Sequence, residues 1–263
     1  KLAAIGLAAF VFASCSDSTD TPNSGNGNSV VDATTIGLTS STPTGVFNYK
    51  NSTANARKLI GSRASDGVTF ITGMPKDIPT IPNLKQELSE NNTKDLVYSE
   101  GGINTYIVKN NNKVDLTGKR IKGVTIFVKG DATLIYDKTE GGNKIVLGKG
   151  AKVQYNGTGS MIAKDDIIYV TEASARLKAE NNIVIEGKLY ANWRGTGKSG
   201  QELRTGLGNT VANEKGEQVV PTQNITFKNG SAAFIDGSLR AVDLNIEEGA
   251  SVNATANVLN ATN

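Results

Sequence analysis

The chain has 263 residues, with 28 Lys and Arg against 25 Asp and Glu, and its net charge of +3 does not indicate nucleic acid as a partner. It contains no His and a single Cys, which excludes Ser-His-Asp and Cys-His catalysis, zinc sites built on His or several Cys, and any intrachain disulfide. The composition predicts no cofactor and no metal site. The 29 Gly and 27 Asn indicate many tight turns.

Residues 1–14 are predicted to be a signal peptide. Lys1 precedes thirteen residues that are apolar except for the last, a stretch shorter than the roughly 20 residues of a membrane-spanning helix. The segment Phe12-Ala13-Ser14-Cys15 resembles the lipobox of bacterial lipoproteins, although Phe12 stands where that motif usually has an aliphatic residue. The resemblance implies that the Cys15 thiol is lipidated and binds the protein to a membrane. A buried core helix with a free Cys is the alternative.

Residues 15–49 are expected to form a disordered tether. Ser16 to Tyr49 contains no Lys or Arg and many Ser, Thr, Asn and Gly, so it has little apolar surface to offset the entropy cost of ordering. Asp17 and Asp20 resemble the short acidic tract of surface lipoproteins from Bacteroidetes-type bacteria. This resemblance implies a lipid-anchored protein of the outer membrane that is exposed on the cell surface.

Residues 50–103 show no clear period and are expected to form a small irregular cap or connecting region. Pro75, Pro79 and Pro82 interrupt this stretch. Residues 82–88 could open one or two helical turns.

Residues 104–263 repeat a unit made of a strand and a tight corner. Five anchor positions each have an aliphatic residue two positions earlier and a small residue four positions later. The anchors are Val128, Leu147, Val170, Phe227 and Ile246, at successive spacings of 19, 23, 57 and 19 residues. Segment 184–189 also matches segment 234–239, so the long gap is interpreted as a lost coil together with an insertion at residues 192–222.

Strands that recur at this interval without helices between them predict an all-β fold. The specific prediction is a single-stranded parallel β-helix, a solenoid in which coils stack and like residues form an internal aliphatic ladder. A β-sandwich is the alternative because it also places short strands at close intervals. The sandwich, however, does not need one recurring sequence unit, so the solenoid is favoured.

Three phrases of the repeat carry a resemblance to a known group of proteins. Segments 149–153, 225–231 and 244–250 look like the β-helical middle region of Bacteroidetes surface lipoproteins that are named for a C-terminal LruC domain. The resemblance covers residues 104–263 and does not include the LruC domain itself. Because Val258 to Asn263 ends in mid-pattern without a polar cap, the chain is expected to be a fragment.

The best acidic pair in the chain is Asp165-Asp166. Adjacent strand residues point to opposite faces, so these two carboxylates could act on one substrate only from a corner. A solvated turn before the strand that begins at Ile167 explains both residues as well, and Glu247-Glu248 occupies a repeated corner position. The sequence therefore predicts turns at both places and no catalytic residues.

The insertion at residues 192–222 holds the candidate ligand-binding residues. It contains the sole Trp, Trp193, beside Arg194, together with Arg204 and several Gly. A protruding loop with Trp and Arg is typical of a recognition surface for a glycan or a host or matrix surface. The alternative, which is favoured, is that Trp193 folds back to cover the edge of a coil.

The leading hypothesis is a cell-surface, lipid-anchored structural or adhesive protein that is not an enzyme. It rests on the lipobox-like segment, the polar tether and the repeat. The first alternative is a β-helical polysaccharide lyase or glycoside hydrolase. The second is a fimbrillin-like pilin precursor, trimmed after Arg63 and followed by a β-sandwich.

Overall fold

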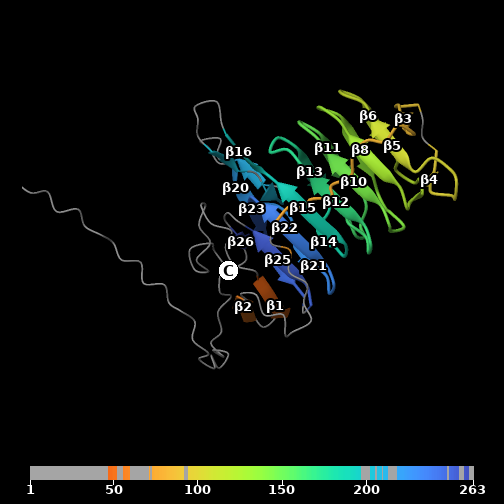
Figure 1. Cartoon of the computed structure of the whole chain (residues 1–263). Helices are drawn as coiled ribbons and strands as arrows, with labels where there is room; N and C mark the ends of the chain where they lie inside the picture. Colours follow the sequence, from red (N-terminus) through yellow and green to blue (C-terminus); the bar gives the residue numbers. More distant parts are fainter. Residues whose placement is uncertain are drawn as a thin grey trace, which may run out of the picture.

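The computed structural model describes residues 47–51, 56–59, 71, 73–91, 94–196, 202–204, 206–208, 210–212, 218–247, 249–254 and 258–260. Within these residues the fold is all β, and parallel strands stack coil upon coil into a β-solenoid (Figure 1). This confirms the predicted parallel β-helix and excludes the β-sandwich that the fimbrillin-like alternative requires. The predicted signal peptide, Cys15 and the tether up to residue 46 lie outside the described residues. None of the described residues forms a helix long and apolar enough to cross a bilayer.

The strands of the solenoid occupy three positions, and not every coil has a strand in all three. The first position forms eight parallel strands that run the whole length of the solenoid. In spatial order they are β3 (Gln86–Leu88), β5 (Thr105–Val108), β8 (Thr125–Val128), β10 (Lys144–Leu147), β12 (Ile167–Val170), β15 (Lys188–Asn192), β22 (Ala232–Asp236) and β25 (Ser251–Ala254).

The other two positions form shorter ladders. The second position holds β6 (Lys113–Asp115), β9 (Thr133–Tyr136), β11 (Lys152–Tyr155) and β13 (Arg176–Ala179), and in the later coils β18 (Gly206–Leu207), β23 (Ser238–Ala241) and β26 (Val258–Asn260). The third position holds β4 (Leu96–Val97) beside β7 (Ile121–Lys122), and then β14 (Ile183–Ile185), β21 (Ile225–Phe227) and β24 (Leu244–Ile246).

The interior of the solenoid is an aliphatic ladder, as the sequence predicts. In the first strand position one inward column consists of register partners whose side chains are at most 3% exposed: Ile126, Ile145, Ile168, Leu189, Ala233 and Val252. Stacking like residues at the strand spacing of about 4.8 Å removes nearly all of their apolar surface from water. This burial is the main stabilising contribution of the fold.

The five anchors belong to two ladders, so the prediction of one repeat with a 57-residue gap is wrong. Val128, Leu147 and Val170 are register partners in the first position. Phe227 and Ile246 lie instead in the third position, beside Ile185. In both positions an inward residue is followed by a corner at the same offset, so the two kinds of strand look alike in the sequence.

The proposed match of segment 184–189 with segment 234–239 is also wrong in register. Ile185 stacks on Phe227, and Leu189 stacks on Ala233. The insertion therefore separates two coils in the sequence that are direct neighbours in space, and their strands pair in register across it.

Backbone geometry explains why Gly recurs at the corners. Gly150, Gly230 and Gly249 have φ of 69°, 82° and 85°. This is the left-handed region, where a side chain costs free energy, so Gly is favoured. Asp131, which replaces Gly at the same offset, adopts φ of 53°, and Asp is among the residues that tolerate this conformation.

The parallel ladder begins before residue 104, inside the stretch expected as a cap. β3 pairs with β5 and β4 pairs with β7, both in parallel. Residues 86–88 are therefore a strand, and the helical turn suggested there is wrong. The tether prediction is also too long at its end, because β1 (Phe47–Asn51) pairs with β2 (Ala56–Leu59) and, at Phe47, with Val252 of β25.

A strap, defined as residue 71 and residues 73–82, crosses the outer face of the first sheet. It starts at the last coil, where the side-chain amide of Asn253 donates to the Ile71 carbonyl at 3.4 Å. It ends at β3 in the first coil. On the way Ile78 packs against an outward cluster whose described members are Ile107, Phe127, Val146, Tyr169, Ile167 and Tyr190. The rings of Tyr169 and Tyr190 stack at 5.6 Å with an interplanar angle of 8°.

Replacing Ile78 by Ser is expected to lower the free energy of unfolding by about 1–2 kcal/mol, because a partly buried apolar side chain loses its contacts with the outward cluster. Hydrogen exchange of the strap backbone should accelerate while the central strands stay protected. Lys76→Ser, at an exposed strap position, is the control. Unchanged exchange of the strap in the Ile78 variant would contradict this role.

Candidate functional site

Trp193 is a core residue, as in the favoured interpretation that it folds back over a coil, and not the ligand-contacting residue that the sequence offered as a candidate. Its side chain is fully buried, and its indole N–H donates to the Ala175 carbonyl at 2.8 Å. Its backbone N–H donates to the Asp236 carbonyl at 3.0 Å. Trp193 therefore joins three parts of the stack, as in the alternative in which it folds back over a coil, and it has no free ring face for a sugar.

Arg194 and Arg204 come together in the backbone, ten residues apart in sequence. They are register partners in an antiparallel hairpin of β16 (Arg194–Thr196) and β17 (Glu202–Arg204). Only the backbone of these two residues is described, so their predicted role in binding stays a prediction.

The insertion is not wholly outside the solenoid wall. After the hairpin, β18 pairs in parallel with β23, and Leu207 is buried. The remainder forms a second antiparallel hairpin, β19 (Thr210–Ala212) with β20 (Gln218–Pro221). Removing residues 192–222 would therefore also remove Trp193 and Leu207 from the core.

Asp165 and Asp166 have different environments. Asp165 is exposed in the turn before β12 with φ of 67°, as the predicted solvated turn requires. Asp166 is buried, and its Oδ1 accepts hydrogen bonds from the backbone N–H and the side-chain amide of Asn143 at 2.8 and 2.9 Å. Its Oδ2 accepts a short hydrogen bond from the Thr139 hydroxyl. Asp166 is thus a structural group that ties two neighbouring coils together.

Asn143 extends this network to a third coil. Its side-chain oxygen accepts the Val124 N–H at 3.2 Å, and its amide also donates to the Ile121 carbonyl at 3.1 Å. Burial raises the pKa of Asp166, and the hydrogen bonds from Thr139 and Asn143 offset part of that rise. A raised pKa is what a general acid needs, but this carboxyl is enclosed and already engaged.

Two substitutions separate the charge of Asp166 from its hydrogen bonds. Because its folded pKa lies above its unfolded value near 3.8, its contribution to stability is fully present below that pH and is lost as the pH rises through the folded pKa. Asp166→Asn should remove this slope and keep the fold, since an amide oxygen can accept from Asn143 and an amide N–H can donate to Thr139. Asp166→Ala should cost about 1–3 kcal/mol because buried donors lose their acceptor.

The measurement is urea unfolding of the three proteins between about pH 3.5 and 7. Equal losses of stability in the Asn and Ala variants would contradict the assignment. So would an unchanged pH slope in the Asn variant.

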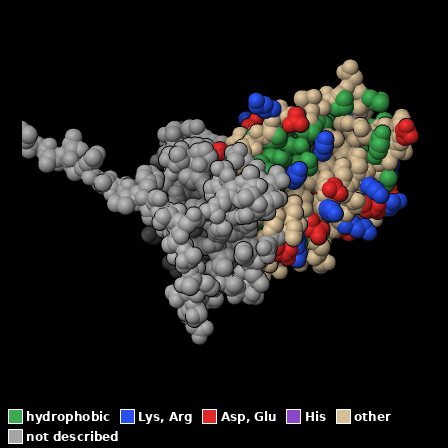
Figure 2. Space-filling model, turned by 60° about the horizontal axis from the view of Figure 1, so that its bottom comes forward, with side chains coloured by type: hydrophobic (Ala, Val, Ile, Leu, Met, Phe, Trp, Pro, Cys, Tyr) green, Lys and Arg blue, Asp and Glu red, His purple; other side chains and the backbone are tan. Residues whose placement is uncertain are grey.

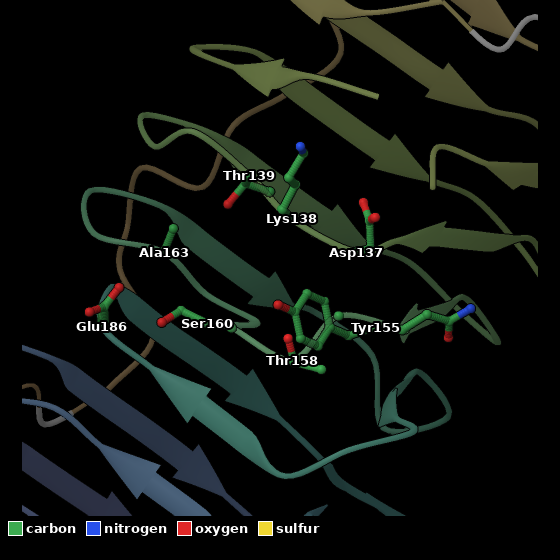
Figure 3. A pocket seen from close by; sticks show the side chains of 11 residues that line it. Asp137, Lys138, Thr139, Tyr155, Thr158, Ser160, Ala163 and Glu186 are labelled. Carbon is green, nitrogen blue, oxygen red and sulfur yellow. The ribbon is translucent and has the colours of Figure 1, made fainter. Parts of the chain in front are cut away.

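A polar cleft of about 540 Å³ lies between the connectors of three successive coils. Tyr155 ends β11, and the other lining residues follow β9, β11 or β14. Figure 3 shows Asp137, Lys138 and Thr139 along one edge, with Ser160 and Glu186 along another. Its full lining is Asp137, Lys138, Thr139, Tyr155, Asn156, Gly157, Thr158, Gly159, Ser160, Ala163 and Glu186.

A second cleft of about 340 Å³ adjoins the first at Glu186. It is lined by Lys164, Asp165, Asp166, Ile167, Glu186, Gly187, Lys188, Asn229 and Gly230. Together the two clefts reach from the connector after β9 to the corner after β21, so they run along the stacking direction of the coils.

Two glycines fix the walls of the clefts. A Cβ on Gly157 would lie 1.9 Å from the Asp137 carbonyl oxygen, and one on Gly187 would lie 2.3 Å from the Asp166 carbonyl oxygen. Only Gly allows these close backbone approaches. The cleft walls are therefore packed against neighbouring coils and are formed before any ligand arrives.

The two tyrosines beneath the first cleft are structural. The rings of Tyr136 and Tyr155 meet edge to face at 5.3 Å, and the Tyr136 hydroxyl donates to the Met161 carbonyl at 2.7 Å. Burial raises the pKa of both phenols, so both stay protonated near neutral pH and cannot act as general bases there.

The surface charges are mixed in sign. Figure 2 shows Lys and Arg interspersed with Asp and Glu over the described part of one face. No group of three or more His, Cys, Asp or Glu suited to a metal ion occurs among the described residues. The chemistry offered by the clefts is hydrogen bonding from hydroxyl, amide, carboxylate and ammonium groups.

Of the residues that line the clefts, sequence reasoning singled out only Asp165 and Asp166, which it assigned to a turn, and it missed the clefts themselves. One signal was present: the spacing from Leu147 to Val170 is four residues longer than that from Val128 to Leu147. The additional residues lie in the connector between β11 and β12, and this connector forms one wall of the first cleft. Comparisons with protein families, with curated proteins and with solved structures gave no match to this chain.

Proposed function

We propose that the protein is a non-enzymatic lipoprotein that is anchored through Cys15 and displays the β-solenoid as a binding surface outside the cell. The observation that carries this proposal is the continuous in-register ladder of eight parallel strands, which makes a stiff scaffold around a close-packed apolar interior. The lipobox-like segment and the polar tether of the sequence supply the anchor. The preformed polar clefts supply surface for a ligand.

The path of the chain supports an orientation for this display. The strap meets the last coil at Ile71 and delivers the chain to β3 in the first coil. An anchor upstream of the strap would therefore lie nearest the C-terminal coils. The N-terminal coils, with the exposed side chains of Leu84 and Tyr98, would then point away from the membrane.

The test uses the complete gene in its own bacterium. Wild-type protein should incorporate labelled fatty acid, accumulate as a precursor when signal peptidase II is inhibited, and be accessible to protease added to intact cells. Cys15→Ser should lose the lipid label, while Ser14→Ala, which keeps a small residue before the Cys, retains it as a control. Unchanged processing under the inhibitor, or full protection from added protease, would contradict the proposal.

A second candidate function is a glycan hydrolase or lyase. The observation that favours it is the presence of two carboxylates, Asp137 and Glu186, with Lys138 in one cleft. A reducing-end and unsaturated-uronate assay over a polysaccharide panel tests it. Release by the wild type that is lost in Glu186→Gln would establish an enzyme in place of a binding protein.

A further inference from the structure

We propose that the two clefts on either side of Glu186 form one extended site for a linear, neutral saccharide that lies along the stacking direction of the coils. This inference deepens the proposed display function, on which it rests for its biological setting. The site itself is defined by the described side chains alone.

The two clefts form one continuous surface. Glu186 lines both of them, and Ala163 of the first cleft is followed in sequence by Lys164 of the second. Each further coil adds one more connector to the wall. A site of this shape fits a chain of repeating units better than a single compact molecule, because successive units meet similar surroundings at each coil.

The charges on the site balance. Carboxylates at Asp137, Asp165 and Glu186 are matched by ammonium groups at Lys138, Lys164 and Lys188. The remaining carboxylate, Asp166, is buried and accepts hydrogen bonds from Asn143 and Thr139. A strongly anionic or cationic ligand would meet as much repulsion as attraction here, so a neutral ligand is favoured.

The hydrogen-bonding groups suit a polyhydroxylated ligand. Sugar hydroxyls can donate to the carboxylates of Asp137 and Glu186 and accept from the ammonium of Lys138. The hydroxyls of Thr158 and Ser160 can do either. The aromatic member of the lining, Tyr155, is buried and offers no ring face, so an apolar peptide anchor has no pocket among these residues.

The site is preorganised, which favours binding by otherwise weak polar groups. Gly157 and Gly187 pack their backbones against neighbouring coils, and Asp166 with Asn143 joins the connectors beneath the site. Little conformational entropy is therefore lost from the protein when a ligand binds.

The experiment measures binding of neutral oligosaccharides by calorimetry and by ligand-observed NMR. The probes are cello-, laminari-, xylo-, manno- and chito-oligosaccharides of one to about six units, with oligogalacturonate as an anionic comparison. The protein is the full chain purified in detergent. We expect at least one neutral series to bind at up to millimolar concentration, with affinity that rises with chain length as both clefts are filled.

Glu186→Gln keeps the side-chain shape and should weaken this binding about tenfold, because one charged acceptor shared by both clefts is lost. Glu172→Gln makes the same change at an exposed corner outside the clefts and should bind as the wild type does. Thermal melting of both variants should match the wild type, since both positions are exposed.

Three results would overturn the proposal: no neutral series binds at millimolar concentration, oligogalacturonate binds more tightly than every neutral series, or Glu186→Gln binds as the wild type does. These results leave lipid anchoring and surface display untouched. Conversely, if the protein binds the saccharide but is neither lipidated nor exposed on the cell surface, the display function is refuted and the saccharide site is retained.

Discussion

Replacing Phe227 by Asp is expected to unfold the solenoid or to lower its free energy of unfolding by about 4 kcal/mol or more. Phe227 is fully buried in the third strand position, between Ile185 and Ile246. The substitution removes a large apolar side chain and places a carboxylate where no charge or donor compensates it. A loss of this size is a large share of the stability of an ordinary domain.

The measurement is denaturant unfolding followed by far-ultraviolet circular dichroism. Thr226→Asp is the matched control, because Thr226 is the adjacent residue of the same strand and is partly exposed. The control should change stability far less. Similar losses in both variants would contradict the inward position of Phe227, and so would a Phe227 variant as stable as the wild type.

Replacing Trp193 by Ala is expected to cost about 3–5 kcal/mol, the usual range for a large aromatic side chain removed from a core. The Ala175 carbonyl would also lose its indole donor. Trp193→Phe keeps an aromatic ring but loses the N–H and part of the ring volume, so it should cost less than the Ala substitution, about 1–2 kcal/mol.

Fluorescence offers an independent check, because Trp193 is the sole tryptophan. Its emission should be blue-shifted and resist quenching by acrylamide in the folded protein. An emission typical of a solvated indole would contradict the burial of Trp193. So would a Trp193→Ala variant that keeps full stability and loses binding to a glycan panel, and this second result would favour a role of Trp193 in ligand contact.

Local chemistry made much of the solenoid predictable. Alternation places Ile126 and Val128 on the same side of one strand, and corners with positive φ require Gly or a substitute such as Asp131. Both signals recur with every coil. They therefore remain visible in the sequence even though the connectors differ in length.

The stacking register was less accessible, for a physical reason. Strands of the first and third positions both place aliphatic residues inward and both end in a corner, so Val170 and Phe227 carry the same local pattern. Which strands become neighbours depends on the length of each connector. The residue preferences within one strand do not specify which strand stacks on it.

The strap and the clefts depend on contacts between distant residues. Ile78 finds its partners on several coils because the outer face of the first sheet has an apolar column, which strand alternation alone marks as solvent-facing. The cleft residue Asp137 is near Gly157 only because two connectors of neighbouring coils stack. The sequence left open whether Trp193 is exposed to a ligand or buried, because its burial depends on contacts with a neighbouring coil.

The register between coils is the central claim, and a disulfide across the insertion tests it most directly. Val184 and Thr226 are register partners 42 residues apart, in β14 and β21. Adjacent parallel strands lie about 4.8 Å apart, within the Cα separation that a disulfide spans. In a Cys15→Ser background, Val184→Cys with Thr226→Cys should cross-link on mild oxidation without loss of stability, and Val184→Cys with Phe234→Cys should not. Cross-linking of the second pair and not the first would show that segments 184–189 and 234–239 stack instead, and would contradict the fold described for these coils.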